Sequence, residues 1–409
     1  MYQETFNTHY LGIGQMSKVK INSWDEFQPL EAVVVGSTYD SSFFDGVKNK
    51  KVSNVLKKIV DETSEDIEYF KQQMRSHNIQ VFQATPTELG YHSSILDYAD
   101  VNGKIGLNSE NPTIVRDALI PIHPLQVRDD SVVMGNKILV TDSTFEVHGY
   151  VKKFQEWFGL DQLDLSLYEG KRNFRRTEEN LKEFIKTRGL NIDFDNLNQE
   201  EQNRLLEENP LVGFCSPNIT RVGKKCLVDL HQTPEAITYL REAYPEFDYS
   251  ELLLGGHNDG IFSVLKPGVV IAGPWFKGCE HNFKDWEFEY FNDPRWDEVL
   301  EWNQIKKRNK GKWWVPGEED NHDFNYFVET ALPHWTGFIE ETIFDLNCLV
   351  VDDRHVVVNS NSKELYSVLE KHGLTPIYCP LRHRFFWDGG WHCLTLDVRR
   401  RGGQNDYGI

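Results

Sequence analysis

The residues best suited to chemistry lie near the C-terminal end of the chain, in the run Gly-Gly-Trp-His-Cys at 389–393. A glycine pair lets the main chain approach a ligand closely. Cys393 follows a histidine and precedes three arginines at 399–401. Nearby positive charge lowers the pKa of a thiol and raises its thiolate fraction. We therefore predict that Cys393 is an activated nucleophile.

A cysteine nucleophile needs a base close to it. His257 is the candidate base, because it lies among glycines and just before a predicted strand pair. Taken by itself, a histidine in such a loop is more simply interpreted as an ordinary polar loop residue. Asp129 and Asp259, taken by themselves, are more simply interpreted as solvated surface charges.

The elements that must position these residues follow a repeated pattern of two apolar strands joined by a tight polar turn. Three clear copies and two weaker ones are found, at 132–140, 262–272, 349–358, 218–228 and 384–396. Helices with a following strand are predicted at 52–75 with 79–82 and at 362–372 with 376–378. Five strand-strand-helix-strand units indicate an α/β fold with radial repetition around a centre. A plain α/β sandwich is the alternative.

Two segments break the repeat, at about 169–210 and 279–335. The first is charged and helix-prone, and the second is rich in acidic and aromatic residues. We predict one domain over 1–409 with these segments as peripheral insertions that pack on the core. The aromatic segment is alternatively a lid or an oligomer contact, since loops on rigid scaffolds often carry function.

The composition of the chain limits the classes of binding partner that it suits. The formal net charge of −19 disfavours nucleic acid and anionic membrane surfaces. The 39% hydrophobic residues support a sizeable core. No export signal and no membrane-spanning run is recognised, and the six cysteines are scattered, so a reducing, cytoplasmic location is expected. A homo-oligomer is compatible with these features.

No metal or cofactor site is expected from the sequence. No phosphate-binding glycine loop follows a strand. The histidines at 372, 383 and 392 are not spaced like zinc ligands.

The run 389–402 resembles the C-terminal signature of the glycine amidinotransferase family, in which the cysteine is catalytic. The resemblance extends to the opening strand at 23–36, to Arg128-Asp129, and to the pattern His-x-Asp-x-x-Phe that begins at His257. It implies an α/β propeller of five ββαβ modules, of the pentein type. It also implies that His257 is the general acid and base, and that Asp129 and Asp259 bind a guanidinium group. Carboxylates suit this ligand, because a guanidinium presents forked donors that a carboxylate accepts in pairs.

The sequence departs from the family pattern in three respects. Asn218 stands where the family has the Asp that orients the catalytic histidine. Its amide oxygen can accept the ring N–H but does not stabilise an imidazolium by charge. Phe276, followed by Lys277, stands where the family has an arginine for the substrate carboxylate. The paired serines that also bind substrate align with Glu340 and Glu341.

The resemblance predicts an amidinotransferase that moves the amidino group of arginine, or of a related guanidino donor, to an acceptor amine through an amidino-cysteine. Its partners are small molecules, and no metal or organic cofactor is needed. A hydrolase of the same superfamily is the first alternative, and a catalytically silent binder of guanidino compounds is the second. The two site residues Gly256 and Leu254 replace the Met and Asn of glycine-using members, which predicts an acceptor larger than glycine.

Overall fold

The computed structural model describes residues 18–100, 123–141, 145–168, 193–199, 216–229, 234–254, 256–291, 315–332 and 345–409, with the isolated positions 182, 201–202 and 335–336. The predicted insertion at about 169–210 lies almost entirely outside these residues. In the described part, no helix is both long and apolar enough to cross a bilayer.

The described strands form five sheets of three strands each. In every sheet the middle strand pairs antiparallel with one neighbour and parallel with the other. The sheets contain β15 (Thr395–Arg400), β1 (Leu30–Val35) and β2 (Gln80–Phe82); β3 (Ser131–Met134), β4 (Lys137–Val140) and β5 (Leu163–Asp164); β6 (Ile219–Val222), β7 (Lys225–Asp229) and β8 (Asp248–Leu252); β9 (Phe262–Lys266), β10 (Val269–Ala272) and β11 (Glu287–Tyr290); β12 (Leu349–Val350), β13 (His355–Val358) and β14 (Thr375–Tyr378).

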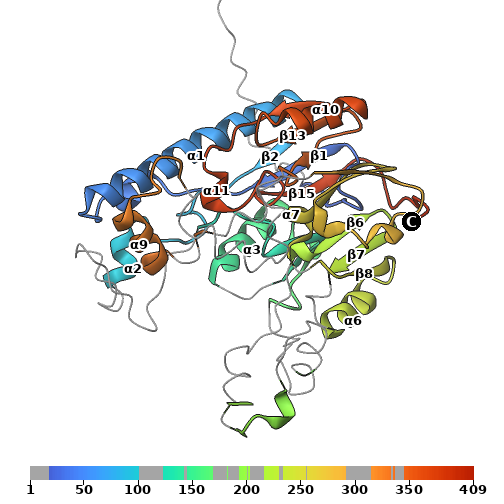
Figure 1. Cartoon of the computed structure of the whole chain (residues 1–409), viewed down its shortest axis with the longest axis horizontal. Helices are drawn as coiled ribbons and strands as arrows, with labels where there is room; N and C mark the ends of the chain where they lie inside the picture. Colours follow the sequence, from blue (N-terminus) through green and yellow to red (C-terminus); the bar gives the residue numbers. More distant parts are fainter. Residues whose placement is uncertain are drawn as a thin grey trace, which may run out of the picture.

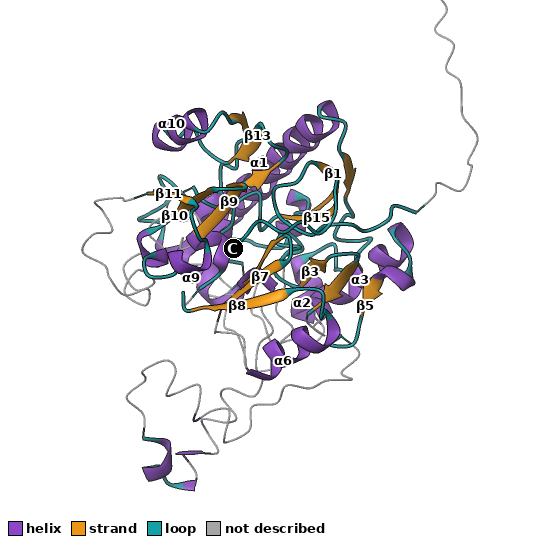
Figure 2. Cartoon of the chain, turned by 90° about the vertical axis from the view of Figure 1, so that its right-hand side faces the viewer, coloured by secondary structure: helices purple, strands orange, loops and turns teal. Residues whose placement is uncertain are grey.

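These sheets follow one another around a common centre, as Figure 2 shows, with helices on the outside. In four of the sheets a helix connects the middle strand to the parallel one. These helices are α1 (Lys50–Ser76), α3 (Phe145–Trp157), α6 (Pro234–Ala243) and α10 (Lys363–Lys371). In the remaining sheet, which is the fourth in chain order and contains β9, β10 and β11, the connection has only the short turns η5 (Pro274–Phe276) and η6 (Glu280–Asn282). The predicted five-module α/β propeller is confirmed.

Local sequence accounts for the hairpins and helix ends. The turns of the second, third and fourth modules contain Gly135, Gly223 and Gly268, each with positive φ, where a side chain would be strained. Helix α10 begins after Ser362, whose side chain accepts from Leu365 N, and ends before Gly373 at φ +70°. Helix α1, along the top of Figure 1, buries an apolar stripe from Val52 to Met74.

The remaining described elements are short or peripheral. Helix α9 (His322–Ala331) lies beside α1, close to α2 (Ile95–Asp100) in Figure 1. The 3-10 turns η1 (Ser41–Phe44), η2 (Leu160–Gln162), η3 (Phe194–Asn196) and η4 (Ser216–Asn218) and the helices α7 (Asn258–Ile261) and α11 (Arg384–Trp387) complete the set. Of these, η4, α7 and α11 flank the candidate site.

Two predictions about elements need correction. The weak hairpin at 384–396 is wrong, because Arg384–Trp387 is the helix α11 and β15 pairs with β1 instead. A four-residue apolar run carries too little periodicity to separate helix from strand. The second correction concerns the segment 279–335. Its first part forms β11, which pairs with β10, so the start of this predicted insertion belongs to the fourth module.

Candidate active site

Cys393 lies in the loop between α11 and β15, and its side chain is fully buried. Two side chains from other modules contact its sulfur. The amide Nδ2 of Asn347 donates to Sγ at 2.7 Å. The thiol donates to the carboxylate Oδ2 of Asp259 at 3.2 Å. The sulfur therefore lies between an N–H donor and a carboxylate.

The loop around Cys393 is held by main-chain contacts that only glycine permits. Gly390 N donates to Asn347 Oδ1 at 3.1 Å. A Cβ added at Gly390 would lie 2.2 Å from Asn347 O and 2.5 Å from Asn359 Nδ2. The predicted use of the glycine pair for close approach thus holds at Gly390, although the partner is this chain's own Asn347.

Asp259, at the second position of α7, is the centre of the charged groups. Its Oδ2 also accepts from His392 Nδ1 at 2.7 Å. Its Oδ1 is buried and accepts no hydrogen bond from the described residues. Burial raises the pKa of Asp259, but the hydrogen bond and charge of His392, with smaller contributions from His257 and Arg128, outweigh it and hold the pKa below its ordinary value. Asp259 is therefore an ionised carboxylate with one oxygen available to a ligand.

His392 lies between two carboxylates. Its Nδ1 contacts Asp259. Its Nε2 lies 3.5 Å from Glu26 Oε2, which is an ion pair without a hydrogen bond. Burial and the Arg128 charge lower the pKa of His392, yet Asp259 and Glu26 outweigh them and raise it. Burial raises the pKa of Glu26, but its contact with His392 and the charges of His392, Arg221 and Arg128 outweigh it and lower the pKa. The three groups form a buried Asp–His–Glu row beside the sulfur.

His257 directly precedes α7 and is half-buried. It lies two residues before Asp259, and its charge is among the smaller causes that lower the pKa of Asp259. Cys393 and Asp259 are in contact and His257 lies near Asp259 in the chain, while the catalytic roles of the three residues stay predictions.

Asn218 and Asp129 reach the same region from the third and second modules. Asn218 is buried at the end of η4, which packs against α7. Its Oδ1 accepts no hydrogen bond from the described part of the chain, so its predicted bond to His257 is not formed here. Asp129 is half-buried and follows Arg128, whose main-chain N donates to Cys393 O at 3.3 Å. Their roles toward a substrate stay predictions.

The three arginines after the cysteine do not contact its sulfur, contrary to the expectation from sequence. Arg399 and Arg401 bind Glu31 near the surface. Arg400 donates to Asp397 Oδ2 at 2.7 Å. Successive side chains of a strand point to opposite faces, so Arg399 and Arg401 share the Glu31 side of β15 while Arg400 points to the buried Asp397.

Asp397 is the buried acceptor for arginines of three modules. Arg400, Arg221 and Arg128 all bind its carboxylate. Arg128 also donates through Nε to the main-chain oxygens of His392 and Thr395. This cluster joins the Cys393 loop to the second and third modules.

Sequence reasoning missed Asn347, Glu26 and Asn359. Asn347 and Asn359 flank the hairpin of the fifth module, and an asparagine beside a strand is an unremarkable residue there. Glu26 lies inside the predicted opening segment. Only their contacts with the Cys393 loop reveal them.

Some of the residues that depart from the family's substrate-binding pattern lie in the described part of the chain. Phe276 is buried and packs on the ring of Phe262 at 4.6 Å between ring centres. Lys277 is exposed, with Nζ 5.7 Å from the ring centre of Tyr290. Glu340 and Glu341 lie outside the described residues.

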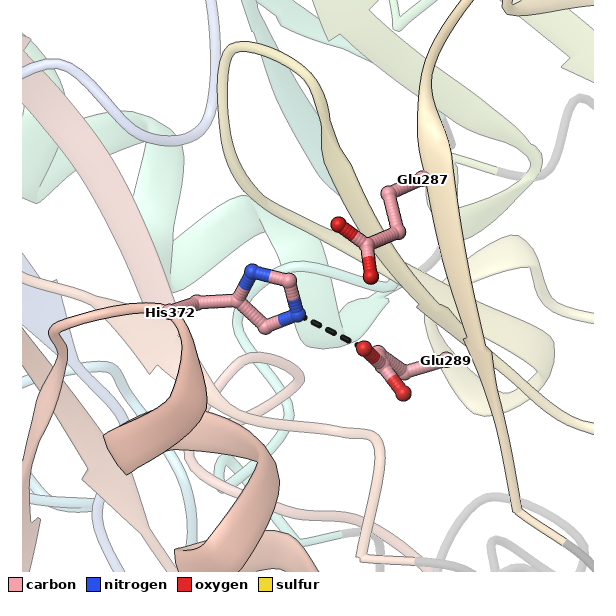
Figure 3. Close-up of side chains that lie close together, drawn as sticks. All are labelled: Glu287, Glu289 and His372. Atoms are coloured by element: carbon pink, nitrogen blue, oxygen red, sulfur yellow. Dashed lines mark hydrogen bonds and ion pairs between the residues drawn. The ribbon is translucent and has the colours of Figure 1, made fainter.

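One group among the described residues could share a metal ion, and it lies elsewhere, on β11 and the end of α10. Glu287, Glu289 and His372 form it, as Figure 3 shows. Lys371 binds both glutamates, and His372 Nε2 is 2.7 Å from Glu289 Oε1. The lysine already supplies the positive charge, so the group is an ion-pair cluster between two modules.

The chain is similar to amidinotransferases in sequence and in structure. No protein-family model matches it. It is 27% identical to the mitochondrial glycine amidinotransferase of Xenopus laevis over 151 residues, which are 37% of this chain and 28% of that relative. It is 35% identical to the L-arginine:L-lysine amidinotransferase of Pseudomonas savastanoi pv. phaseolicola over 63 residues, 15% of this chain and 17% of the relative. The alignments therefore span less than a third of these curated relatives.

Two solved structures share the fold over nearly the whole chain. The amidinotransferase SxtG of Microseira wollei superposes with a TM-score of 0.57 at 16% identity, covering 95% of this chain and 99% of that one. The inosamine-phosphate amidinotransferase StrB1 of Streptomyces griseus gives 0.56 at 18% identity, with the same coverage. The predicted relation to the glycine amidinotransferases is confirmed for the aligned stretch, and the fold is confirmed for the whole.

Proposed function

We propose that this chain is an amidinotransferase that uses Cys393 as nucleophile on arginine or a related guanidino donor. The observation that carries the proposal is Asp259. Its Oδ2 lies 3.2 Å from Cys393 Sγ, while its buried Oδ1 has no partner among the described residues. A guanidinium held by this carboxylate has its central carbon close to the sulfur, which is the arrangement that attack requires.

The reaction balances with groups of this chain alone. His257 takes the thiol proton, and the thiolate forms a C–S bond to the central carbon. The C–N bond to the donor's amine breaks as His257 returns the proton to that amine. An acceptor amine then attacks the amidino-cysteine, loses a proton to His257, and displaces the thiolate. Asp129 serves as a second carboxylate for the guanidinium.

Transfer rather than hydrolysis fits the burial of the site. Cys393 is fully buried, and so is the Asp–His–Glu row beside it. A buried amidino-cysteine is shielded from water, which limits hydrolysis before an acceptor binds. The names of the two curated relatives support transfer as well, because both are amidinotransferases.

A mass measurement tests the proposal. Wild-type protein mixed with arginine should gain an amidino group on Cys393, and Cys393→Ala should neither gain it nor turn over. Cys379→Ala is the matched control, since burial raises the pKa of that thiol to about 12 and leaves it inert. An adduct on another cysteine would refute the assignment. Release of the donor's amine without added acceptor would indicate a hydrolase, and binding without adduct a silent binder.

We also propose a reducing, cytoplasmic location for the protein. The five cysteines in the described ranges are buried and form no disulfide. Growth in an oxidising compartment should therefore lower the yield of active protein through oxidation of Cys393. Oligomeric state stays a prediction that sedimentation would decide.

A further inference from the structure

We propose that Asn347 is a further catalytic residue, whose amide N–H stabilises the Cys393 sulfur as a thiolate. The inference rests on the proposed function, because it assigns a partner to the same nucleophile. Asn347 lies just before β12 in the fifth module and is fully buried. Cys393 lies in the loop before β15, so the fold brings the two together from distant parts of the chain.

The orientation of the Asn347 amide follows from its neighbours. Its Oδ1 accepts from Gly390 N at 3.1 Å and from Cys393 N at 3.0 Å. Main-chain N–H groups only donate, so the amide oxygen must face them. The amide nitrogen then faces Sγ, at 2.7 Å. A flipped amide would lose both main-chain bonds.

A second asparagine holds the first one in place. Asn359 Nδ2 donates to Asn347 O at 3.1 Å, and Asn359 Oδ1 accepts from Trp391 N at 3.0 Å. The Cys393 loop and the Asn347 segment are thus bonded at several points. A donor fixed before the reaction needs no reorganisation when charge develops on the sulfur.

The charges around the sulfur explain why a thiolate needs a hydrogen-bond donor there. In this structure the thiol gives its hydrogen bond to Asp259, whose negative charge disfavours a thiolate at 3.2 Å. The other charged groups nearby are His392, Glu26, Arg128 and His257. Once a guanidinium occupies Asp259 and the thiol proton passes to His257, the sulfur keeps the Asn347 N–H as its fixed donor.

The decisive variant is Asn347→Asp. It preserves the size and the oxygen that accepts from Gly390 and Cys393, but it replaces the donor to sulfur by an oxygen. The thiolate can be followed by its ultraviolet absorbance during a pH titration, as the difference from the same variant carrying Cys393→Ala. We expect the titration midpoint of Cys393 to rise by about one to two pH units. With arginine, kcat at neutral pH should fall at least tenfold while the donor KM changes little.

The matched control is Asn359→Asp, which makes the same change at a buried amide that does not contact the sulfur. It should move the midpoint by less than half as much. Equal shifts in the two variants would overturn the proposal, because they would reflect only an added buried charge. An unchanged midpoint in Asn347→Asp would overturn it as well, since Asn347 would then serve only to hold the loop.

Further measurements distinguish the Asn347 result from misfolding and from a failure of the proposed function. Circular dichroism checks each variant, and if Asn347→Asp does not fold, Asn347→Ser takes its place. Its shorter hydroxyl does not reach the sulfur and both N–H groups, and a wild-type midpoint there would count against the inference. The titration needs no guanidino donor. A wild type that forms no amidino adduct would therefore refute the proposed function without touching the Asn347 result.

Discussion

At the scale of residues, the surroundings of Cys393 combine opposite charges rather than a cluster of positive ones. The sulfur of Cys393 contacts Asp259 Oδ2, and the imidazole of His392 contacts the same oxygen. The arginines that follow the cysteine bind Glu31 and Asp397 instead. A cationic substrate suits this arrangement, because it meets a carboxylate first.

His257→Ala should slow turnover by about 10²–10⁴-fold, the range typical of a lost general acid and base. The leaving amine would depart without a proton, so adduct formation from arginine should slow as well. Steady-state rates and the time course of the adduct measure both effects. His322→Ala is the control, since this histidine is exposed on α9. Equal activity in the two variants would remove His257 from the mechanism.

The acceptor should be larger than glycine. Gly256 and Leu254 are half-buried next to His257, where glycine-using amidinotransferases have a Met and an Asn. Comparing kcat/KM for glycine, lysine and short diamines, with arginine as donor, tests this. Gly256→Met should reduce the value for lysine more than the value for glycine. A preference of the wild type for glycine over every larger amine would contradict the expectation.

At the scale of elements, the loop between α11 and β15 needs a glycine for a steric reason. A Cβ at Gly390 would lie 2.2 Å from Asn347 O, a main-chain atom that has no room to move away. Gly390→Ala should therefore destabilise the protein by about 1–3 kcal/mol and displace Cys393 from Asn347 and Asp259.

Urea unfolding and amidino-adduct formation report the two effects of Gly390→Ala. Gly403→Ala is a matched control, because a Cβ there has no atom within 4 Å and the glycine has no positive φ. A Gly390→Ala protein with wild-type stability and adduct yield would show that the loop tolerates the shift.

At the scale of the whole molecule, Asp397 joins modules that are far apart in sequence. It accepts from Arg128 before β3, Arg221 in β6 and Arg400 in β15. Burial raises the pKa of Asp397, but the charges of Arg221, Arg128 and Arg400 outweigh it and hold the pKa well below its ordinary value. The cluster closes the ring of modules together with the pairing of β1 and β15.

Asp397→Asn should cost about 3–5 kcal/mol of folding free energy, because three buried arginines lose their shared carboxylate. A lowered folded-state pKa contributes stability above the unfolded pKa of about 4, and this contribution is lost as pH falls through the folded pKa. The stability difference between wild type and variant, measured by urea unfolding, should therefore be full at pH 6 and shrink below about pH 4. Asp406→Asn, at an exposed pair with Lys224, should change stability little. A difference that does not depend on pH would mean that the charge of Asp397 is not what stabilises the ring.

The raised pKa of His392 makes stability depend on pH in the opposite direction. Its protonated form contributes stability below about pH 6.5, and this contribution is lost as pH rises through the folded pKa. The two groups together favour maximal stability between these limits.

The sequence by itself indicated most of the modules and the candidate site residues. Turn glycines, apolar strands and helix caps act over a few neighbours, so the hairpins of β3–β4, β9–β10 and β12–β13 and the helix α10 were predictable. Cys393, His257 and Asp259 were identified because their local patterns resemble a known signature. Tertiary structure alone decided the contacts between modules. The pairing of β15 with β1, the reach of Asn347 to the sulfur, the Asp259–His392–Glu26 row and the direction of each arginine all join segments that sequence spacing does not relate. Such contacts depend on how five sheets close around one centre, which no local pattern encodes.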